Sequence, residues 1–194
     1  MMNLDDPVAT ALKITRLLEH DDVAYGLYGG LAVAAWGVPR ETKDADLAVV
    51  SSDADRVAGL LSADRVEVAV AFRRVRFGAL VISRVTLFGG EDITGLNTVD
   101  LVEPASPRYA AAAVARAIRA PLRDTEISLL TPEDVVIFKV LSTREKDLED
   151  AAGILARLGP EIELPRIDEE LETLAGEIPD HEILHRWSRC RARI

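Results

Sequence analysis

The sequence has little of what cross-links or anchors many small proteins. It contains a single cysteine, Cys190, which excludes an internal disulfide framework and any zinc site built on several cysteines. The uncharged stretch of residues 23–38 has only 16 residues, four of them glycine, and a membrane helix needs about 20 apolar residues. The N-terminus is acidic where a signal peptide would be basic. We therefore expect a soluble, cytoplasmic protein without a membrane partner.

Aromatic residues are also scarce, at 5% of the chain. Hydrophobic residues nevertheless make up 48% of the 194 residues, which excludes a disordered chain and is enough for a buried core of aliphatic side chains. The formal net charge of −10 is regional, because residues 161–182 carry −8 and the other 172 residues only −2. The acidity therefore does not exclude a polyanionic substrate bound elsewhere.

Hydrophobic periodicity and turn residues predict an α/β order in the first half of the chain. Asp5-Asp6-Pro7 is typical of a helix start, and Gly29-Gly30 separates a strand from a short helix. An arginine-rich turn at residues 73–76 joins two strands, and an acidic loop follows Gly89-Gly90. The expected helices cover residues 7–20, 31–36 and 53–62, and the expected strands cover residues 23–28, 45–49, 66–72, 77–88 and 97–102.

The second half reads as helical. Ser106-Pro107 begins a helix expected to reach residue 120, and Thr131-Pro132 begins another, with threonine as cap and proline in the first turn. A further helix is expected at residues 146–158, and two more in the acidic segment and the basic tail. We therefore expect a small mixed sheet as the core, residues 1–130 with an N-terminal helix, followed by a C-terminal helical subdomain, residues 131–194.

The candidate catalytic residues lie at the end of the expected strand 23–28 and on or beside the expected strands 45–49 and 97–102. Glycines at a strand–helix junction, here Gly29 and Gly30, let a phosphate approach the backbone and the helix N-terminus. Asp44 and Asp46 are two apart on a strand, so both carboxylates leave one face about 7 Å apart at Cα. Asp100 lies on a second alternating strand. Three carboxylates at one place suit divalent cations, which can clamp the oxygens of a phosphoryl transfer.

This arrangement resembles the signature of the polymerase-beta-type nucleotidyltransferase superfamily: Gly29-Gly30, a spacer, then Asp44-Ala45-Asp46. The spacer, with Gly37, Arg40 and Thr42, is similar to the branch of AbiEii/AbiGii-type nucleotidyltransferase toxins. The chain departs from many superfamily members, which have Gly-Ser in this motif. Here Leu31 follows Gly29-Gly30, so no hydroxyl is offered to the phosphate.

The second half adds to the resemblance. Lys139 on the helix that begins at Thr131, and Lys146-Asp147-x-x-Asp150 after it, look like that branch's lysine-bearing helix and its KDxxD motif. The resemblance implies that Lys139 contacts the triphosphate, and that Asp147 and Asp150 bind nucleotide or order Lys139. The alternatives are a lysine that snorkels to solvent and a solvated face with local pairs to Arg144 and Lys146. Arg40 and Lys43 are either phosphate contacts or loop residues.

Several arginines offer candidate contacts for a nucleic-acid backbone. They are Arg73, Arg74, Arg76, Arg116, Arg119 and Arg123. The tail from His185 to Ile194 holds four arginines and Trp187, which either stack on RNA or cover the acidic segment of the same chain. For all the arginines outside the tail, the alternative is a solvated face.

The function expected from the residues and the resemblance is nucleotidyl transfer. An NMP would pass from an NTP to an acceptor hydroxyl, with two Mg²⁺ ions held by Asp44 and Asp46 and one of them shared with Asp100. The family suggests that the acceptor is RNA, with the tRNA 3′ end as one candidate, and that a cognate antitoxin is a partner. A small-molecule acceptor of the antibiotic type, or a non-catalytic binding module with the same fold, stays open.

Overall fold

The computed structural model describes residues 6–88 and 96–194. Its seven strands form one mixed sheet in the order β3-β4-β5-β2-β1-β7-β6. The strands are β1 (Tyr25–Tyr28), β2 (Ala45–Val49), β3 (Glu67–Phe77), β4 (Leu80–Phe88), β5 (Leu96–Pro104), β6 (Ile118–Leu122) and β7 (Thr125–Leu129).

Helices surround this sheet. In the described part of the chain they are α1 (Pro7–His20), α2 (Gly29–Ala35), α3 (Ala54–Ala63), α4 (Pro107–Ala115), α5 (Pro132–Leu141), α6 (Glu145–Leu158), the 3₁₀ helix η1 (Gly159–Glu161), α7 (Leu164–Glu177) and α8 (Ile183–Arg191). The α/β fold with a mixed sheet and C-terminal helices is confirmed, while the division at residue 130 stays a prediction.

The central strands carry different chemistry on their two faces, because successive side chains on a strand alternate. β1 pairs antiparallel with β2, and β2 pairs parallel with β5. Leu47 and Leu101 face each other in that register and are buried. Leu18 of α1 and Val57 of α3 line the same small cavity as Leu101, and α1 packs against β2 and β5 while α3 packs against β4. These two helices therefore cover the apolar face. The neighbouring residues Asp46 and Asp100 therefore leave the opposite face.

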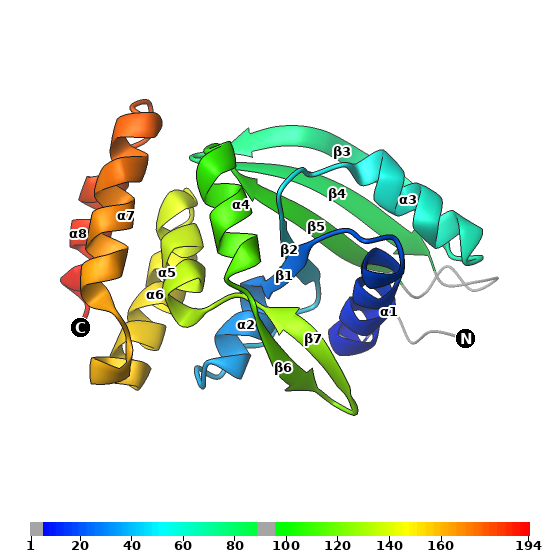
Figure 1. The fold of residues 1–194 in the computed structure, drawn as a ribbon, viewed down its shortest axis with the longest axis horizontal. Coiled ribbons are helices and arrows are strands. Elements are labelled where there is room, and N and C mark those ends of the chain that lie inside the picture. Colours follow the sequence, from blue (N-terminus) through cyan, green and yellow to red (C-terminus); the bar gives the residue numbers. More distant parts are fainter. Residues whose placement is uncertain (1–5, 89–95) are drawn as a thin grey trace.

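Helices α5 to α8 pack against one another at one end of the molecule, as Figure 1 shows. Thr131 caps α5 by accepting the N–H of Asp134, and Pro132 and two acids follow in the first turn. Every residue of α5 from Glu133 to Leu141 is buried, so this helix is the centre of the group. The link between α5 and α6, residues 142–144, faces the sheet.

The N-caps expected from the sequence are present. Asp6 accepts the N–H groups of Val8 and Ala9 at the start of α1, and Asp53 caps α3. Asp5 and the acidic loop after Gly89-Gly90 lie outside the described residues.

The expected arginine-rich turn at residues 73–76 is wrong. Strand β3 continues through these residues to Phe77, and the chain reverses at Gly78, whose φ is +66°. Glycine adopts that conformation without steric cost. The register of β3 against β4 shifts between Val70 and Phe72 and again between Phe72 and Val75. These irregularities disturb the alternation that would have marked a single long strand.

The expected helix over residues 106–120 is also too long. Helix α4 ends at Ala115, and β6 begins at Ile118 and forms a hairpin with β7. Pro121 is tolerated because β6 is an edge strand. The hairpin is held by the parallel pairing of Leu129 with Leu27 of β1. A contact across about a hundred residues leaves no local signature in the sequence.

Candidate active site

The two aspartates of the central strands are direct neighbours. Asp46 of β2 is opposite Asp100 of β5 in the parallel register, and opposite Tyr28 of β1 on its other side. Adjacent strands lie about 4.8 Å apart, so the two carboxylates start from neighbouring points on one face. Asp44 lies just before β2, two residues from Asp46. The structure thus brings the predicted aspartates to one region of the sheet.

Gly29 and Gly30 lie directly against this region. Gly29 has φ +67°, and a Cβ there would collide with the carboxylate of Asp46. A Cβ on Gly30 would come within 2.6 Å of Thr42. Helix α2 begins at Gly29, and its N-cap, Tyr28, makes no side-chain cap hydrogen bond. The glycines therefore permit close contact between the helix start and the aspartate strand.

The electrostatics of Asp46 are those of a carboxylate without a counter-charge. Its side chain is partly buried, and burial together with the charges of Asp100 and Asp44 raises its pKa from 3.8 to about 6, although Lys139 opposes this shift. Neither Asp46 nor Asp44 has a hydrogen-bond or ion-pair partner for its carboxylate among the described residues. Clustered, partly desolvated carboxylates of this kind favour a bound cation.

Asp100 differs, because Arg84 of β4 occupies both of its oxygens. Arg84 Nε donates to Oδ1 at 2.6 Å and a terminal nitrogen donates to Oδ2 at 2.7 Å. Within residues 6–88 and 96–194, no three His, Cys, Asp or Glu side chains are arranged to hold a metal ion. The donor chemistry of the aspartates fits Mg²⁺, which takes carboxylate oxygens. The guanidinium is the cation that Asp100 contacts here.

A cavity of about 270 Å³ opens between this face of the sheet and the α5–α6 link. Asp46, Asp100, Arg84 and Tyr28 line its sheet side, and Ser142, Thr143 and Arg144 line the other. The remaining lining residues are apolar: Phe72, Phe77, Leu80, Ile82 and Val102. The cavity therefore places an apolar wall beside the carboxylates.

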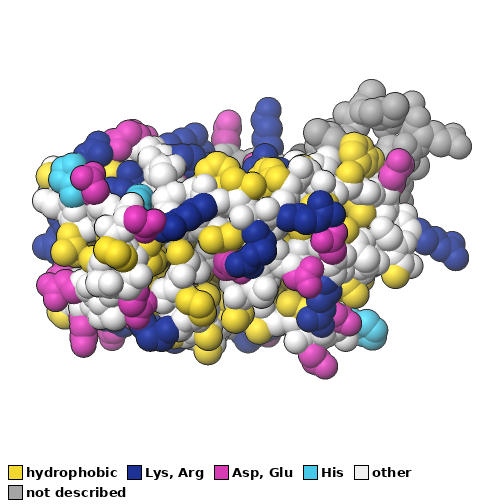
Figure 2. Space-filling view, turned by 90° about the horizontal axis from the view of Figure 1, so that it is seen from above, with side chains coloured by type: hydrophobic (Ala, Val, Ile, Leu, Met, Phe, Trp, Pro, Cys, Tyr) yellow, Lys and Arg dark blue, Asp and Glu magenta, His cyan; other side chains and the backbone are white. Residues whose placement is uncertain are grey.

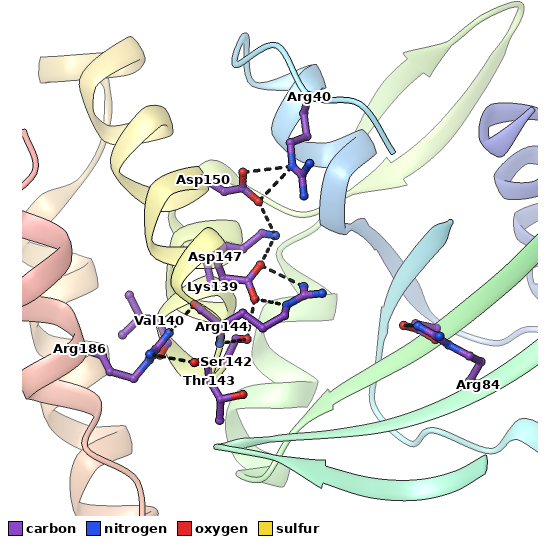
Figure 3. A network of polar contacts seen from close by, with 11 residues as sticks. Arg40, Arg84, Lys139, Val140, Ser142, Thr143, Arg144, Asp147, Asp150 and Arg186 are labelled. Atoms are coloured by element: carbon purple, nitrogen blue, oxygen red, sulfur yellow. Dashed lines mark hydrogen bonds and ion pairs between the residues drawn. The ribbon is translucent and has the colours of Figure 1, made fainter. Parts of the chain in front are cut away.

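Lys139 is buried, with 1% of the residue exposed, so it does not snorkel to solvent. Its Nζ donates to Asp147 at 2.7 Å and to Asp150 at 2.9 Å, and it lies 5.3 Å from the centre of the Tyr28 ring. Figure 3 shows this network, in which Arg40 reaches Asp150 from the loop after α2. The lysine amine is thus neutralised within the protein and does not line the cavity.

Asp147 is the centre of the network. It also accepts hydrogen bonds from Ser142 at 2.6 Å and from Arg144 at 2.7 Å. Burial alone would raise the pKa of Asp147, but the charge of Lys139 and these hydrogen bonds lower it to about 2. The carboxylate is therefore ionised across the physiological range, and it holds α6 to the end of α5 and positions the link that lines the cavity.

Arg186 of α8 holds the same link from behind. This buried guanidinium donates to the backbone carbonyls of Val140, Thr143 and Arg144, the first at 2.9 Å, and Figure 3 shows it approaching from the side opposite the sheet. The sequence offered it only as one of four tail arginines. Its isolated position among Ile183, Trp187 and Cys190, which are buried on the same helix, is the signal that could have identified it.

Arg84 was not expected as a site residue either. It occupies the same face of β4 as Leu80 and Ile82, and all three line the cavity. An arginine in phase with inward-facing apolar residues was the available signal. Lys43, by contrast, is exposed and has no ion-pair partner among the described residues, so the structure does not connect it with the network of Arg40 and Lys139.

The arginines expected to meet a nucleic-acid backbone are occupied by carboxylates of the same chain. The pairs are Arg73 with Asp55, Arg74 with Glu103, Arg76 with Asp180, Arg116 with Asp134, Arg119 with Glu19, and Arg123 with Asp6. In the tail, Arg191 pairs with Asp168, and Arg189 and Arg193 pair with Glu145. Figure 2 accordingly shows basic and acidic side chains mixed over the visible face.

None of the helices described is long and apolar enough to cross a bilayer.

Comparison by sequence is negative: no family model and no curated protein matches the chain. Comparison by structure is positive. A nucleotidyltransferase-like protein from Paracoccidioides brasiliensis matches with a TM-score of 0.54 and 20% identity, over 91% of this chain and 90% of that one. The antibiotic-resistance factor ANT(2″)-Ia matches with a TM-score of 0.51 and 14% identity, over 89% and 91%. The chain therefore has the fold of the nucleotidyltransferase-like proteins.

Proposed function

We propose that the protein is a metal-dependent nucleotidyltransferase, which moves an NMP from an NTP to an acceptor hydroxyl and releases pyrophosphate. The observation that carries the proposal is the unpaired carboxylate of Asp46 beside Gly29, with Asp44 and Asp100 next to it, at the edge of a cavity in a nucleotidyltransferase-like fold. Two carboxylates without counter-charges beside an uncapped helix start suit a cation and a phosphate together.

Asp44 and Asp46 are the residues that would hold Mg²⁺. The chemistry that Mg²⁺ supplies when bound is neutralisation of phosphate charge and orientation of the reacting oxygens. Gly29 and Gly30 would let the triphosphate approach the backbone of α2, because no side chain stands in the way. Asp100 would accept the proton of the acceptor hydroxyl only if its hydrogen bonds with Arg84 were exchanged.

The second-half residues act mainly by positioning. Lys139, Asp147 and Asp150 hold α6 against α5, and they thereby place Arg144 at the cavity, while Arg40 binds Asp150 at the far end of the network. The network of Lys139, Arg144 and Arg40 with two aspartates carries one net positive charge. That charge favours binding of the polyanionic NTP on this side of the cavity.

We propose RNA as the acceptor, as the resemblance to AbiEii-type toxins implies, with the tRNA 3′ end as the candidate hydroxyl and an antitoxin as partner. The cavity supports an acceptor that inserts a single nucleotide, since its apolar wall includes the rings of Phe72 and Phe77. A small-molecule acceptor is the second candidate, because the fold also matches ANT(2″)-Ia.

The test is to incubate the protein with each α-labelled NTP, Mg²⁺, and either total RNA or a panel of aminoglycosides. We expect label on RNA that depends on Mg²⁺. Asp46→Asn should abolish the transfer, and Asp124→Asn, which changes an exposed turn residue, should leave it intact. Label on an aminoglycoside would favour the second candidate. Transfer that persists in Asp46→Asn would contradict the mechanism, and no transfer to any acceptor would favour a non-catalytic binding module.

A further inference from the structure

Arg84 and Asp100 form a built pair at the centre of the site. They face each other in the antiparallel register of β4 and β5. The guanidinium donates two parallel hydrogen bonds, at 2.6 and 2.7 Å, to the two oxygens of a residue that is 7% exposed. This fork geometry is the strongest form of an arginine–carboxylate contact. The guanidinium also lies 5.5 Å from the centre of the Phe72 ring, which orients it further.

The position of the pair matters because Asp100 is flanked by strands on both sides. Asp46 neighbours it in β2 and Arg84 neighbours it in β4. The hydrogen bonds that Arg84 donates to Asp100 raise the pKa of Arg84, although burial opposes this, and the charges of Asp100, Asp44 and Asp46 add to the rise. The guanidinium is therefore a permanent positive charge held against the carboxylate cluster.

The charges of the three aspartates and of Arg84 indicate how many metal ions the site requires. Asp44, Asp46 and Asp100 carry three negative charges when ionised, and Arg84 supplies one positive charge. Two negative charges remain, on the two carboxylates that have no partner among the described residues. One divalent cation balances them. A second metal ion at Asp100 would have to displace the bidentate guanidinium of Arg84. It would also be repelled by the first metal ion, since paired metal ions lie roughly 4 Å apart.

We propose that Arg84 is a built-in cation that takes the place of a second metal ion, so that the site binds one divalent ion, at Asp44 and Asp46. This inference rests on the proposed function, since it assumes that the aspartates hold a metal. Arg84 thus does more than stabilise the fold through an ion pair. The guanidinium sets the number of metal ions that bind, and it neutralises Asp100.

The experiment counts bound Mn²⁺ by electron paramagnetic resonance during titration of the full chain at pH 8. We expect one Mn²⁺ per wild-type chain, with the six-line signal of an isolated ion. Arg84→Ala should bind two, and the close pair should give a broadened, spin-coupled signal. Arg84→Lys, which keeps the charge, should bind one. Arg73→Ala is the matched control, because Arg73 forms a bidentate pair with Asp55 on the surface of β3; it should bind one.

The possible outcomes are distinct. Two ions in the wild type, or one ion in a folded Arg84→Ala, would overturn the inference and leave the proposed function standing. No bound Mn²⁺ in the wild type would instead contradict the metal site of the proposed function. If circular dichroism shows that Arg84→Ala is unfolded, Arg84→Met keeps a side chain on Phe72 and takes its place. If that variant also unfolds, the wild-type count decides alone, with one ion in support and two against.

Discussion

At the residue scale, the site depends on a glycine and a carboxylate that share one small volume. Gly29 has a left-handed backbone, and the Asp46 carboxylate lies where a Cβ of residue 29 would be. The carboxylate in turn is partly buried, lies next to two like charges and has a raised pKa. The two residues therefore depend on each other: the absence of a side chain at Gly29 leaves the space that the Asp46 carboxylate occupies.

The glycine makes the first prediction. Gly29→Ala should lower the free energy of unfolding by at least about 1–2 kcal/mol, the cost of a left-handed conformation for a residue with a Cβ, and the contact with Asp46 adds to that loss. Gly59→Ala is the control, because a Cβ there meets nothing within 4 Å, and alanine within a helix should stabilise by about 0.5–1 kcal/mol. Urea unfolding of both variants measures the difference. Equal changes in both would contradict the assigned strain.

The carboxylate makes the second prediction, which concerns pH. The pKa of Asp46 is about 6 in the folded protein against 3.8 for an ordinary aspartate. The folded state therefore binds more protons than the unfolded state between these values, and stability falls as pH rises through this window. Asp46→Asn removes that loss. With EDTA present, the variant should match the wild type at pH 4 and exceed it by about 1–3 kcal/mol at pH 8.

Thermal and urea unfolding at several pH values measure this difference. The control is Asp124→Asn, whose side chain is exposed, and its stability should follow that of the wild type at every pH. A difference between Asp46→Asn and the wild type that does not change with pH would contradict the raised pKa.

At the element scale, the junction of α5 and α6 is the part that positions the cavity wall. Lys139 on α5 and Asp147 and Asp150 on α6 form a buried ionic cluster. Arg186 holds the link between the helices from α8. A short link held from both sides leaves Ser142, Thr143 and Arg144 in one arrangement toward the sheet. The two aspartates of the KDxxD pattern thus join α6 to α5 through Lys139.

The third prediction follows from this cluster. Lys139→Met should lower the free energy of unfolding by about 3–5 kcal/mol, because it removes the buried cation that Asp147 and Asp150 share. The two carboxylates then keep only the more exposed Arg144 and Arg40. Lys146→Met is the matched control on the exposed side of α6 and should change stability by no more than about 0.5 kcal/mol. Urea unfolding measures both. A loss below about 1 kcal/mol in Lys139→Met, with impaired NTP use, would point instead to direct contact between Lys139 and the triphosphate.

At the scale of the whole molecule, the candidate phosphate-binding arginines are paired with carboxylates of the same chain. The arginines that resemble a phosphate-binding surface have carboxylate partners on other elements. Basic and acidic side chains accordingly lie side by side on the face in Figure 2. An RNA acceptor would therefore be held mainly by the cavity, which Arg144 lines, rather than by a broad basic surface.

The fourth prediction is a weak salt dependence. A single-stranded RNA that neutralises about two basic groups should lose less than about tenfold in affinity between 50 and 200 mM salt. Fluorescence anisotropy with a labelled tRNA 3′-end oligonucleotide measures this change. A loss of a hundredfold or more would mean that several of the paired arginines release their carboxylates and bind phosphate instead.

The sequence by itself determined those features that depend on near neighbours along the chain. The caps at Asp6 and Thr131 act on N–H groups two or three residues away, and the alternation around Asp46 marks its strand. These are local interactions, and they also predicted the α/β fold and the helical C-terminal part. The resemblance to nucleotidyltransferases came from the same short motifs.

Only the tertiary structure decided which charges meet. Arg84 pairs with Asp100 because the register of β4 against β5 sets them opposite each other. Arg186 reaches Val140 across 46 positions, and the β6–β7 hairpin exists because Leu129 pairs with Leu27 of β1. Such partners depend on the packing of whole elements. A long arginine side chain can reach several acceptors, and the packing decides which of them lies within hydrogen-bond distance. Lys139 was for this reason recognisable in the sequence as a candidate triphosphate contact, while its burial and its neutralisation by Asp147 and Asp150 became evident only in the folded chain.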